Sequence, residues 1–294
     1  MRTNGALACW GNRRRGVPPP PNGKFKQVSV FGYAFACAVR SDGAVACWGH
    51  NYNTHTRPPS GRFTEVSAGL DFACGVRVTG NLACWGYHRW NDAKPPSGKF
   101  THVSTSVSGF SDEYSCGVRV AGRLACWGAK IAGDTKPPPG IFTQVSAGRN
   151  FACGVKSDNS LVCWGSNLHG QATPSSGSFG QLSAGVDFAC GLGISGSITC
   201  WGVNMNGETT APSGRFQQVS SGLDFACGVK ANGSVACWGV NTNGESTAPS
   251  GKFAQISADY SNGCGIRTDN SLACWGGQGT AGRLGRTAWR QQSK

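Results

Sequence analysis

Apolar and small polar residues alternate along most of this chain, and the alternation restarts at a regular interval. In residues 224–239, Phe225, Cys227 and Val229 alternate with smaller residues, a turn follows at 231–233, and a second run ends in a C-W-G tripeptide. Alternation on both sides of a glycine-containing turn is typical of a β-hairpin. The pattern recurs in six further segments: residues 35–49, 72–86, 114–128, 151–165, 188–202 and 262–276.

The hairpin register predicts which cysteines face each other. With a three-residue loop at 41–43 that ends in glycine, Arg40 faces Ala44, and counting outward places Cys37 opposite Cys47. This pair should be a non-hydrogen-bonded one, where Cα atoms are about 4.5 Å apart, a separation that suits a disulfide. We therefore predict seven cross-strand disulfides: Cys37–Cys47, Cys74–Cys84, Cys116–Cys126, Cys153–Cys163, Cys190–Cys200, Cys227–Cys237 and Cys264–Cys274.

Buried, reduced thiols in a cytosolic protein are the alternative to these disulfides. Burial alone would not require the two cysteines to face each other directly in every hairpin. The pattern therefore favours disulfides and an oxidising compartment. The spacing does not suit zinc, because no histidine accompanies the cysteine pair of each hairpin. Cys9 lacks the strand that would carry its partner.

Each hairpin follows another alternating run that opens with phenylalanine, as in residues 63–68. We therefore predict three strands in each unit. The spacing between Trp164, Trp201, Trp238 and Trp275 gives a unit length of 37 residues. Both faces of the hairpin are mainly apolar, as in a sheet packed between two others. These features predict an all-β fold: a seven-bladed β-propeller of three-stranded repeats of about 37 residues. A β-solenoid is the alternative.

The repeats divide the chain into three parts. We expect residues 1–26 to hold a partial repeat and a connector, in which the C-W-G at 9–11 either closes the ring or is a fragment of an eighth unit. Residues 27–276 hold the seven propeller repeats. Residues 277–294 carry no recognisable repeat and are expected to form a basic, flexible tail.

The recurring pattern V-S-A-G-x-x-F-A-C-G-V-x-x-x-G-x-x-x-C-W-G, found across residues 5–276, resembles the regulator-of-chromosome-condensation repeat superfamily. It is most similar to the short-repeat branch, with the propeller-type β-lactamase inhibitor and crinkly-type receptor ectodomains. The resemblance implies a seven-bladed propeller that serves as a protein-binding platform. Many relatives carry histidine two residues before the first cysteine, so the different residues here transfer no functional role: Phe35, Phe72, Tyr114, Phe151, Phe188, Phe225 and Asn262.

Charge adds a candidate interaction surface. The chain has 27 Lys and Arg against 14 Asp and Glu, a formal net charge of +13, which favours anionic partners. Strand directions place basic residues mainly on the rim with the hairpin turns, and acidic residues in loops of the opposite rim. Two basic series are candidate partner-binding residues: Arg40, Arg77, Arg119, Lys156, Lys230 and Arg267 after the first cysteine, and Lys24, Arg62, Lys99, Arg215 and Lys252 before the first strand. Alternatively, cations at strand ends only keep edges soluble.

Trp90 is a further candidate, because it lies in a variable loop outside the C-W-G register. An exposed tryptophan is a common hot spot of protein interfaces, although it can also pack beneath its own loop.

No catalytic, cofactor or metal signature accompanies these features. The chain lacks G-x-S-x-G, phosphate-loop and H-E-x-x-H motifs, and its five histidines lie at unrelated repeat positions. The N-x-N-G-E segments at 204–208 and 241–245 mildly resemble a calcium loop, but turn chemistry explains them better. A glycosylation sequon at 232–234 lies inside a tight turn. We therefore expect no enzyme, no cofactor and no metal.

We interpret the chain as a non-catalytic, protein-binding propeller that uses its loop rims. The partner is expected to be a protein, with an acidic surface as the sharper hypothesis and a polyanion as an alternative. Nucleic acid is disfavoured because the aromatics serve blade packing, and no apolar run reaches the ~18 residues of a membrane span. Narrower functions are an inhibitor of a secreted enzyme such as a β-lactamase, or a guanine-nucleotide exchange factor for a small GTPase.

The paired cysteines predict an extracellular or periplasmic location, although residues 1–10 do not resemble a signal peptide. A cytoplasmic location is the alternative. We expect a monomer.

Overall fold

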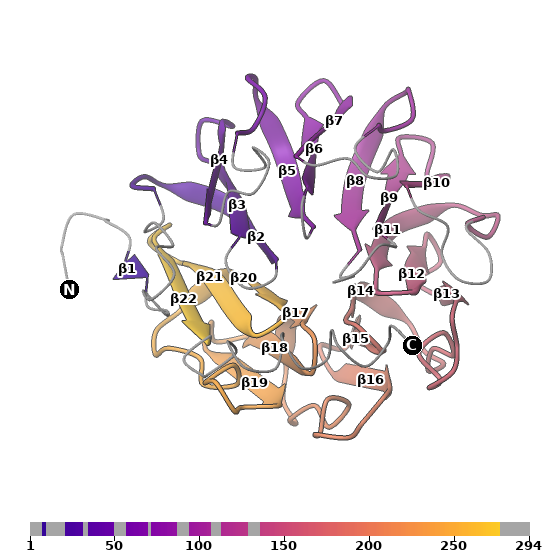
Figure 1. The fold of residues 1–294 in the computed structure, drawn as a ribbon. Helices are drawn as coiled ribbons and strands as arrows, with labels where there is room; N and C mark the ends of the chain where they lie inside the picture. Colours follow the sequence, from indigo (N-terminus) through magenta and orange to yellow (C-terminus); the bar gives the residue numbers. More distant parts are fainter. Residues whose placement is uncertain are drawn as a thin grey trace, which may run out of the picture.

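The computed structural model describes residues 8–9, 21–31, 35–49, 57–69, 72–86, 94–106, 113–128 and 136–276. These residues form seven sheets, each containing three consecutive antiparallel strands, and one of them also includes a short strand from near the start of the chain. Figure 1 shows the sheets arranged in a ring. The predicted all-β propeller is confirmed. Within the described ranges there is no helix that could cross a membrane.

Each sheet is one blade, numbered here from 1 to 7 along the chain, and its strands follow in sequence order from the centre outward. The inner strands are β2 (Phe25–Phe31), β5 (Phe63–Ala68), β8 (Phe100–Thr105), β11 (Phe142–Ala147), β14 (Phe179–Ala184), β17 (Phe216–Ser221) and β20 (Phe253–Asp259). The middle strands are β3 (Phe35–Arg40), β6 (Phe72–Arg77), β9 (Tyr114–Arg119), β12 (Phe151–Lys156), β15 (Phe188–Gly193), β18 (Phe225–Lys230) and β21 (Asn262–Arg267). The outer strands are β4 (Val45–Gly49), β7 (Leu82–Gly86), β10 (Leu124–Gly128), β13 (Leu161–Gly165), β16 (Ile198–Gly202), β19 (Val235–Gly239) and β22 (Leu272–Gly276).

The turn between the middle and outer strands has the predicted three-residue form. The Arg40 N–H donates to the Ala44 carbonyl at 2.8 Å, which closes the loop at the expected pair. The third loop residue has a positive φ, 92° at Gly43 and 66° at Asn159. Glycine and asparagine tolerate this left-handed backbone, whereas most residues with a Cβ are strained there.

The predicted disulfides are confirmed in all seven blades. Cys37 pairs directly with Cys47 in the register of β3 and β4, and the equivalent cysteines pair in the same way in every other hairpin. The S–S distances run from 1.99 to 2.08 Å, and the Cα atoms are 3.9 to 4.0 Å apart. The side chain of Cys9 lies outside the described residues.

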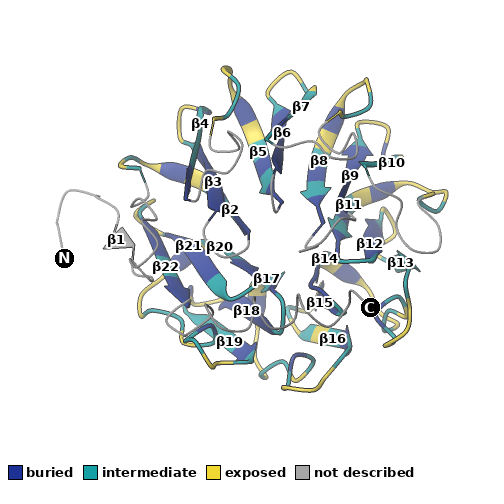
Figure 2. Ribbon diagram, in the orientation of Figure 1, coloured by how far each residue is buried: buried dark blue, intermediate teal, exposed yellow. Residues whose placement is uncertain are grey.

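Two unlike apolar faces meet between neighbouring blades. Phe151, Cys153 and Val155 of blade 4 pack with Leu182 and Trp201 of blade 5, among other residues. Clusters of this kind join every consecutive pair of blades, and one joins blade 7 to blade 1. The core is therefore a ring of seven interfaces rather than one central cluster, and Figure 2 shows exposed residues concentrated in the turns between buried strands.

Backbone hydrogen bonds also join each blade to the next at one rim. The Phe63 N–H at the start of blade 2 donates at 2.7 Å to the carbonyl of Gly43, in the turn of blade 1. Each later blade makes the equivalent bond with the blade before it, and the Phe25 N–H of blade 1 donates to Asn270 of blade 7 at 3.4 Å. The ring predicted from the repeat count is closed by these bonds.

The partial repeat near the start contributes a short strand to the last blade. β1 (Ala8–Cys9) pairs in parallel with β22, with Ala8 opposite Ala273. The rest of residues 1–20 and the predicted basic tail at 277–294 lie outside the described residues.

The disulfides lead to a labelling prediction. Fourteen of the fifteen cysteines are paired, so native, unreduced protein should take up at most one iodoacetamide per chain in mass spectrometry. Reduction in denaturant before labelling should raise the uptake to fifteen, which serves as the control. Uptake of most thiols without reduction would show that the cysteines are free in solution.

Candidate functional site

The two predicted basic series lie on one rim. The Val78 N–H, one residue after Arg77, donates at 3.0 Å to the carbonyl of Arg62 in the same blade. All seven blades repeat this bond between the hairpin turn and the residue before the inner strand. Turns and inner-strand starts therefore form one continuous surface, which we call the basic rim: Arg40, Arg77, Arg119, Lys156, Lys230, Arg267, Lys24, Arg62, Lys99, Arg215 and Lys252.

The arginines of the first series are held within their own blades. The Arg77 guanidinium lies over the Phe63 ring, with its Cζ 4.9 Å from the ring centroid. Its Nη1 donates to the Ser60 carbonyl at 2.7 Å, and Arg40, Arg119 and Arg267 make matching contacts. These side chains are half-buried, so they fix the connector against the blade as well as adding charge to the rim.

The second basic series is more exposed. Lys24, Arg62, Lys99, Arg215 and Lys252 all have exposed side chains. Because these cations precede consecutive inner strands, they come from blades 1, 2, 3, 6 and 7. They are the members of the basic rim best placed to meet a partner.

The acidic residues on the basic rim are engaged in their own turns. Asp158 Oδ1 accepts from the backbone and hydroxyl of Ser160, at 2.9 and 2.6 Å, and these bonds hold the pKa of Asp158 below its ordinary value. Ser271 lowers the pKa of Asp269 in the same way. The carboxylate of Asp42 accepts from the Ala44 N–H. The three carboxylates therefore accept hydrogen bonds from backbone N–H groups of their own turns.

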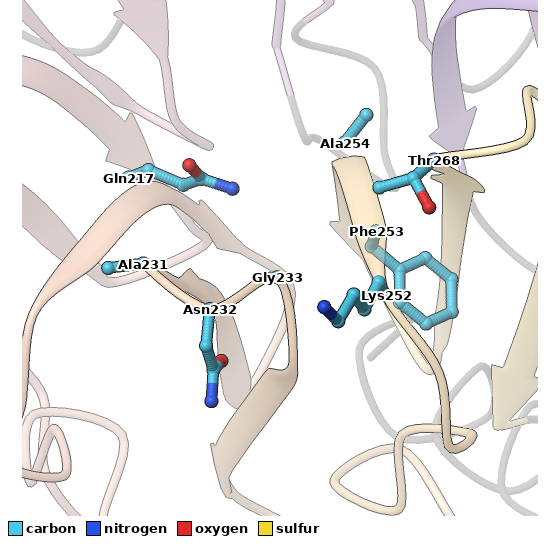
Figure 3. Close-up of a pocket in the computed structure, with 8 residues that line it drawn as sticks. All are labelled: Gln217, Ala231, Asn232, Gly233, Lys252, Phe253, Ala254 and Thr268. Atoms are coloured by element: carbon cyan, nitrogen blue, oxygen red, sulfur yellow. The ribbon is translucent and has the colours of Figure 1, made fainter.

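An open depression interrupts the rim between blades 6 and 7. Figure 3 shows the turn at Ala231–Gly233 on one side of it and Lys252 and Phe253 on the other. Gln217, Ala254 and Thr268 complete its lining. The depression thus combines one ammonium group with polar amide and hydroxyl groups, a lining that suits a carboxylate.

The opposite rim carries acidic residues, as predicted. Burial raises the pKa of Asp224, and the nearby carboxylates of Glu208, Asp187 and Glu245 raise it further. Glu208 is buried and accepts from the backbone N–H and side-chain amide of Asn206, each at 2.8 Å. Glu245 makes the same bonds with Asn243, so the N-x-N-G-E segments act as turns.

Other predicted features of this rim are only partly described. Asp71 and Trp90 lie outside the described residues, so the proposed role of Trp90 stays a prediction. Among the described residues, no group of three or more His, Cys, Asp or Glu side chains is placed to hold a metal.

The central channel contains a polar ring that sequence reasoning missed. A β-bulge precedes the third residue of each inner strand and sets the direction of its side chain. Gln218 in β17 donates from Nε2 to the Ile256 carbonyl at 2.8 Å and accepts from the Ile256 N–H at 2.7 Å. Five glutamines bridge to the next blade in this way: Gln27, Gln144, Gln181, Gln218 and Gln255.

A second ring lies two residues further along each inner strand. Ser183 Oγ accepts from the Ser221 N–H of the next blade at 2.9 Å. All seven blades make this bond. The two rings satisfy backbone groups at the free inner edges of the sheets, so the main role of these side chains is to join the blades.

The glutamine ring is broken at blades 2 and 3 by an ion pair. His102 Nδ1 lies 2.8 Å from Glu65 Oε1, and His102 Nε2 lies 2.8 Å from the Val145 carbonyl of blade 4. Burial alone would lower the pKa of His102, but the Glu65 carboxylate and these hydrogen bonds outweigh it and raise the pKa above 6.5. The repeated F-x-Q-V-S pattern contained the signal: Glu65 and His102 stand where other inner strands carry glutamine.

Comparison with protein families agrees with this architecture. The model described as "Regulator of chromosome condensation (RCC1) repeat" matches residues 25–54, 142–171 and 216–245. The chain contains RCC1 repeats. Each matched segment begins with an inner strand and continues a few residues past the outer strand of the same blade, so the family repeat and the structural blade coincide.

Solved structures share the propeller of this RCC1-repeat chain. The ectodomain of the Arabidopsis thaliana receptor kinase ACR4 is 26% identical, with a TM-score of 0.70 over 86% of this chain and 96% of that one. The CR4 ectodomain of Physcomitrella patens is 24% identical, with a TM-score of 0.71 over 87% and 74% of the two chains. Prp20p of Saccharomyces cerevisiae is 14% identical, with a TM-score of 0.66 over 80% of each. A comparison with curated protein sequences found no match.

The glutamine ring predicts a stability effect at the channel. Replacing Gln218 by alanine removes two hydrogen bonds and leaves the Ile256 N–H and carbonyl with no protein partner, so the free energy of unfolding should fall by about 1–3 kcal/mol. Urea unfolding of Gln218→Ala measures the change. The exposed neighbour Gln217, replaced by alanine, is the matched control and should shift the midpoint little. Equal shifts for both variants would contradict the role of the ring.

The ion pair predicts a pH dependence with a definite sign. Since the folded-state pKa of His102 is raised, the stabilisation by Glu65 is complete below about 6.5, the unfolded pKa, and is lost as the pH rises through the folded pKa. Glu65→Gln should therefore lower stability by about 1 kcal/mol near pH 6 and by progressively less toward pH 9. Urea unfolding of both proteins across this range tests it. A difference that does not change with pH would exclude the ion pair as its cause.

Proposed function

We propose that this RCC1-repeat chain is a non-catalytic binding module whose basic rim receives an acidic surface of a protein partner. One observation carries the proposal: the ring collects exposed cations from five blades on a single rim. The residues are Lys24, Arg62, Lys99, Arg215 and Lys252.

The two rims of the ring differ in charge, and this difference supports the proposal. On the basic rim, Asp158 and Asp269 accept hydrogen bonds within their own turns but remain exposed and ionised, so they reduce the positive charge of the rim without outnumbering its exposed lysines and arginines. On the opposite rim, the carboxylates of Glu208, Asp187 and Glu245 lie close enough to Asp224 to raise its pKa. A partner with an acidic patch would therefore be steered toward one rim and repelled by the other.

The half-buried arginines add rigidity to this surface. Their stacking on phenylalanine and their bonds to connector carbonyls hold the turns and connectors of the rim in place. A rigid binding surface loses little conformational entropy when a partner docks. The proposal assigns direct contact to the exposed series and support to the arginine series.

The disulfides and the relatives also bear on the proposal. Seven cysteine pairs at disulfide distance favour an oxidising compartment, and we place the protein outside the cytoplasm on this ground. The ACR4 propeller is the ectodomain of a receptor kinase, and Prp20p is described with binding properties to Gsp1p and histones. The binding properties of Prp20p, which shares the fold, support a binding role here.

Charge reversal on the two rims tests the proposal. Lys99→Glu and Arg149→Glu change the net charge equally, but Lys99 is on the basic rim and Arg149 is in the loop between β11 and β12 on the other. Affinity for immobilised poly-glutamate, measured by biolayer interferometry, should fall about fivefold for Lys99→Glu and change little for Arg149→Glu. The triple variant Lys24→Glu, Arg62→Glu, Lys99→Glu should abolish binding. Equal losses for both single variants would mean that net charge alone governs retention, and the rim proposal would fall.

A further inference from the structure

Exposed aliphatic residues interrupt the basic rim on one side of the ring. Val78, Val120 and Ile141 are 58%, 64% and 50% exposed, in blades 2, 3 and 4. Val78 and Val120 are the first residues of their hairpin turns, a position that also holds Ile194, 69% exposed, in blade 5, but Ser41, Ser157, Ala231 and Thr268 in the other blades. Blade 5 carries Ser178 instead of a cation before its inner strand, so Ile194 has no basic neighbour of the kind that Val78 and Val120 have. Ile141 replaces the exposed cation that precedes the inner strand in other blades. The aliphatic residues thus mark one sector of the rim and are not a property of every repeat.

Backbone hydrogen bonds show that this sector is continuous. The Val78 N–H donates to Arg62, and the turn that contains Val78 accepts at Gly80 from Phe100, the residue after Lys99. The Val120 N–H donates to Lys99 in turn, and Gly122 accepts from Phe142, the residue after Ile141. Basic and aliphatic residues therefore follow one another around the rim in a line that we call the rim strip: Arg62, Val78, Lys99, Val120 and Ile141.

We propose that the rim strip binds an extended segment of the protein partner in which acidic residues alternate with large aliphatic ones. The inference rests on the proposed function and deepens it, because it names the kind of partner segment. Arg62 and Lys99 would pair with the carboxylates, and Val78, Val120 and Ile141 would remove the aliphatic side chains from water.

The line-like layout favours an extended segment over a compact patch. Along the strip, each blade adds its residues beside those of the previous blade, so a partner chain that follows the rim meets them in succession. Charge also argues against the chain's own residues 277–294 as the occupant, because that segment contains basic residues and no Asp or Glu. Like charges on strip and tail would repel.

Three labelled peptides test the rim strip by fluorescence anisotropy at low salt. The first repeats Glu-Leu-Asp-Ser, the second replaces each Leu by Ser, and the third replaces each acid by its amide. The first peptide should bind at least tenfold more tightly than the other two. The variant Val78→Ser, Val120→Ser, Ile141→Ser should reduce that affinity to the level of the second peptide, while its affinity for the second peptide stays unchanged.

Two control variants separate the contributions. Arg62→Gln with Lys99→Gln should weaken binding of both acidic peptides. Leu168→Ser with Met205→Ser removes side chains that are 87% and 85% exposed, in loops that follow the C-W-G motifs on the opposite rim, and should leave all affinities unchanged. All substituted positions are exposed, so the variants are expected to fold; circular dichroism and the count of free thiols verify this.

The outcomes distinguish the two proposals. If the first peptide binds no more tightly than the second, or the aliphatic variant binds like the parent, the rim strip is overturned while acidic recognition stands. If neither acidic peptide binds, the proposed function itself falls. If light scattering shows a dimer that the aliphatic variant dissolves, the occupant is a second copy of the chain, and the inference of a partner segment is wrong.

Discussion

The structure depends on how the blades satisfy their inner edges. A three-stranded sheet leaves a row of unpaired N–H and C=O groups on its first strand, and such edges otherwise recruit further strands. Here side chains of one blade bond to the backbone of the next blade. Gln218 bonds to both the N–H and the carbonyl of Ile256, and Ser183 Oγ accepts from the Ser221 N–H. Each bond joins one blade to the next, so edge protection and ring closure are the same interaction.

The apolar interfaces impose a second constraint, because each blade must have two different faces. The face that carries the disulfide, as in Cys153–Cys163, packs against the face that carries tryptophan in the next blade, as in Trp201. A small residue opposite each tryptophan leaves room for the indole: the register sets Ala189 against Trp201. The same repeat can therefore form every blade of the ring, because the disulfide face of any blade fits the tryptophan face of the next. The disulfides hold the middle and outer strands of each blade in the register that this fit requires.

Features within one repeat could be predicted from the sequence, whereas most side-chain contacts between repeats could not. Turn residues such as Gly43 set the hairpin register, the register set the Cys37–Cys47 pair, and the repeat count set the ring. Gln218 was not identified, because its role depends on which backbone atoms of the next blade lie beside it. Arg77 was predicted on the correct rim, but its stacking on Phe63 depends on the path of the connector. His102 looked isolated until its place among the glutamines was known.

These constraints also explain where specificity can reside. The Gln218 side chain is committed to hydrogen bonds that join two blades, and Cys153 to a disulfide within its own blade. Arg77 bonds to the connector of its blade and so contributes only part of its side chain to the rim surface. The side chains are less committed at the residue before each inner strand and at the first residue of each turn, although Arg62 Nε donates to the Asp42 carbonyl of blade 1 at 2.7 Å. The two positions carry Lys24 and Ser41 in blade 1, but Ile141 and Ser157 in blade 4. Variation at these two positions changes the rim from blade to blade while the glutamine and serine bonds that close the ring stay the same, so recognition and folding rest on largely separate sets of residues.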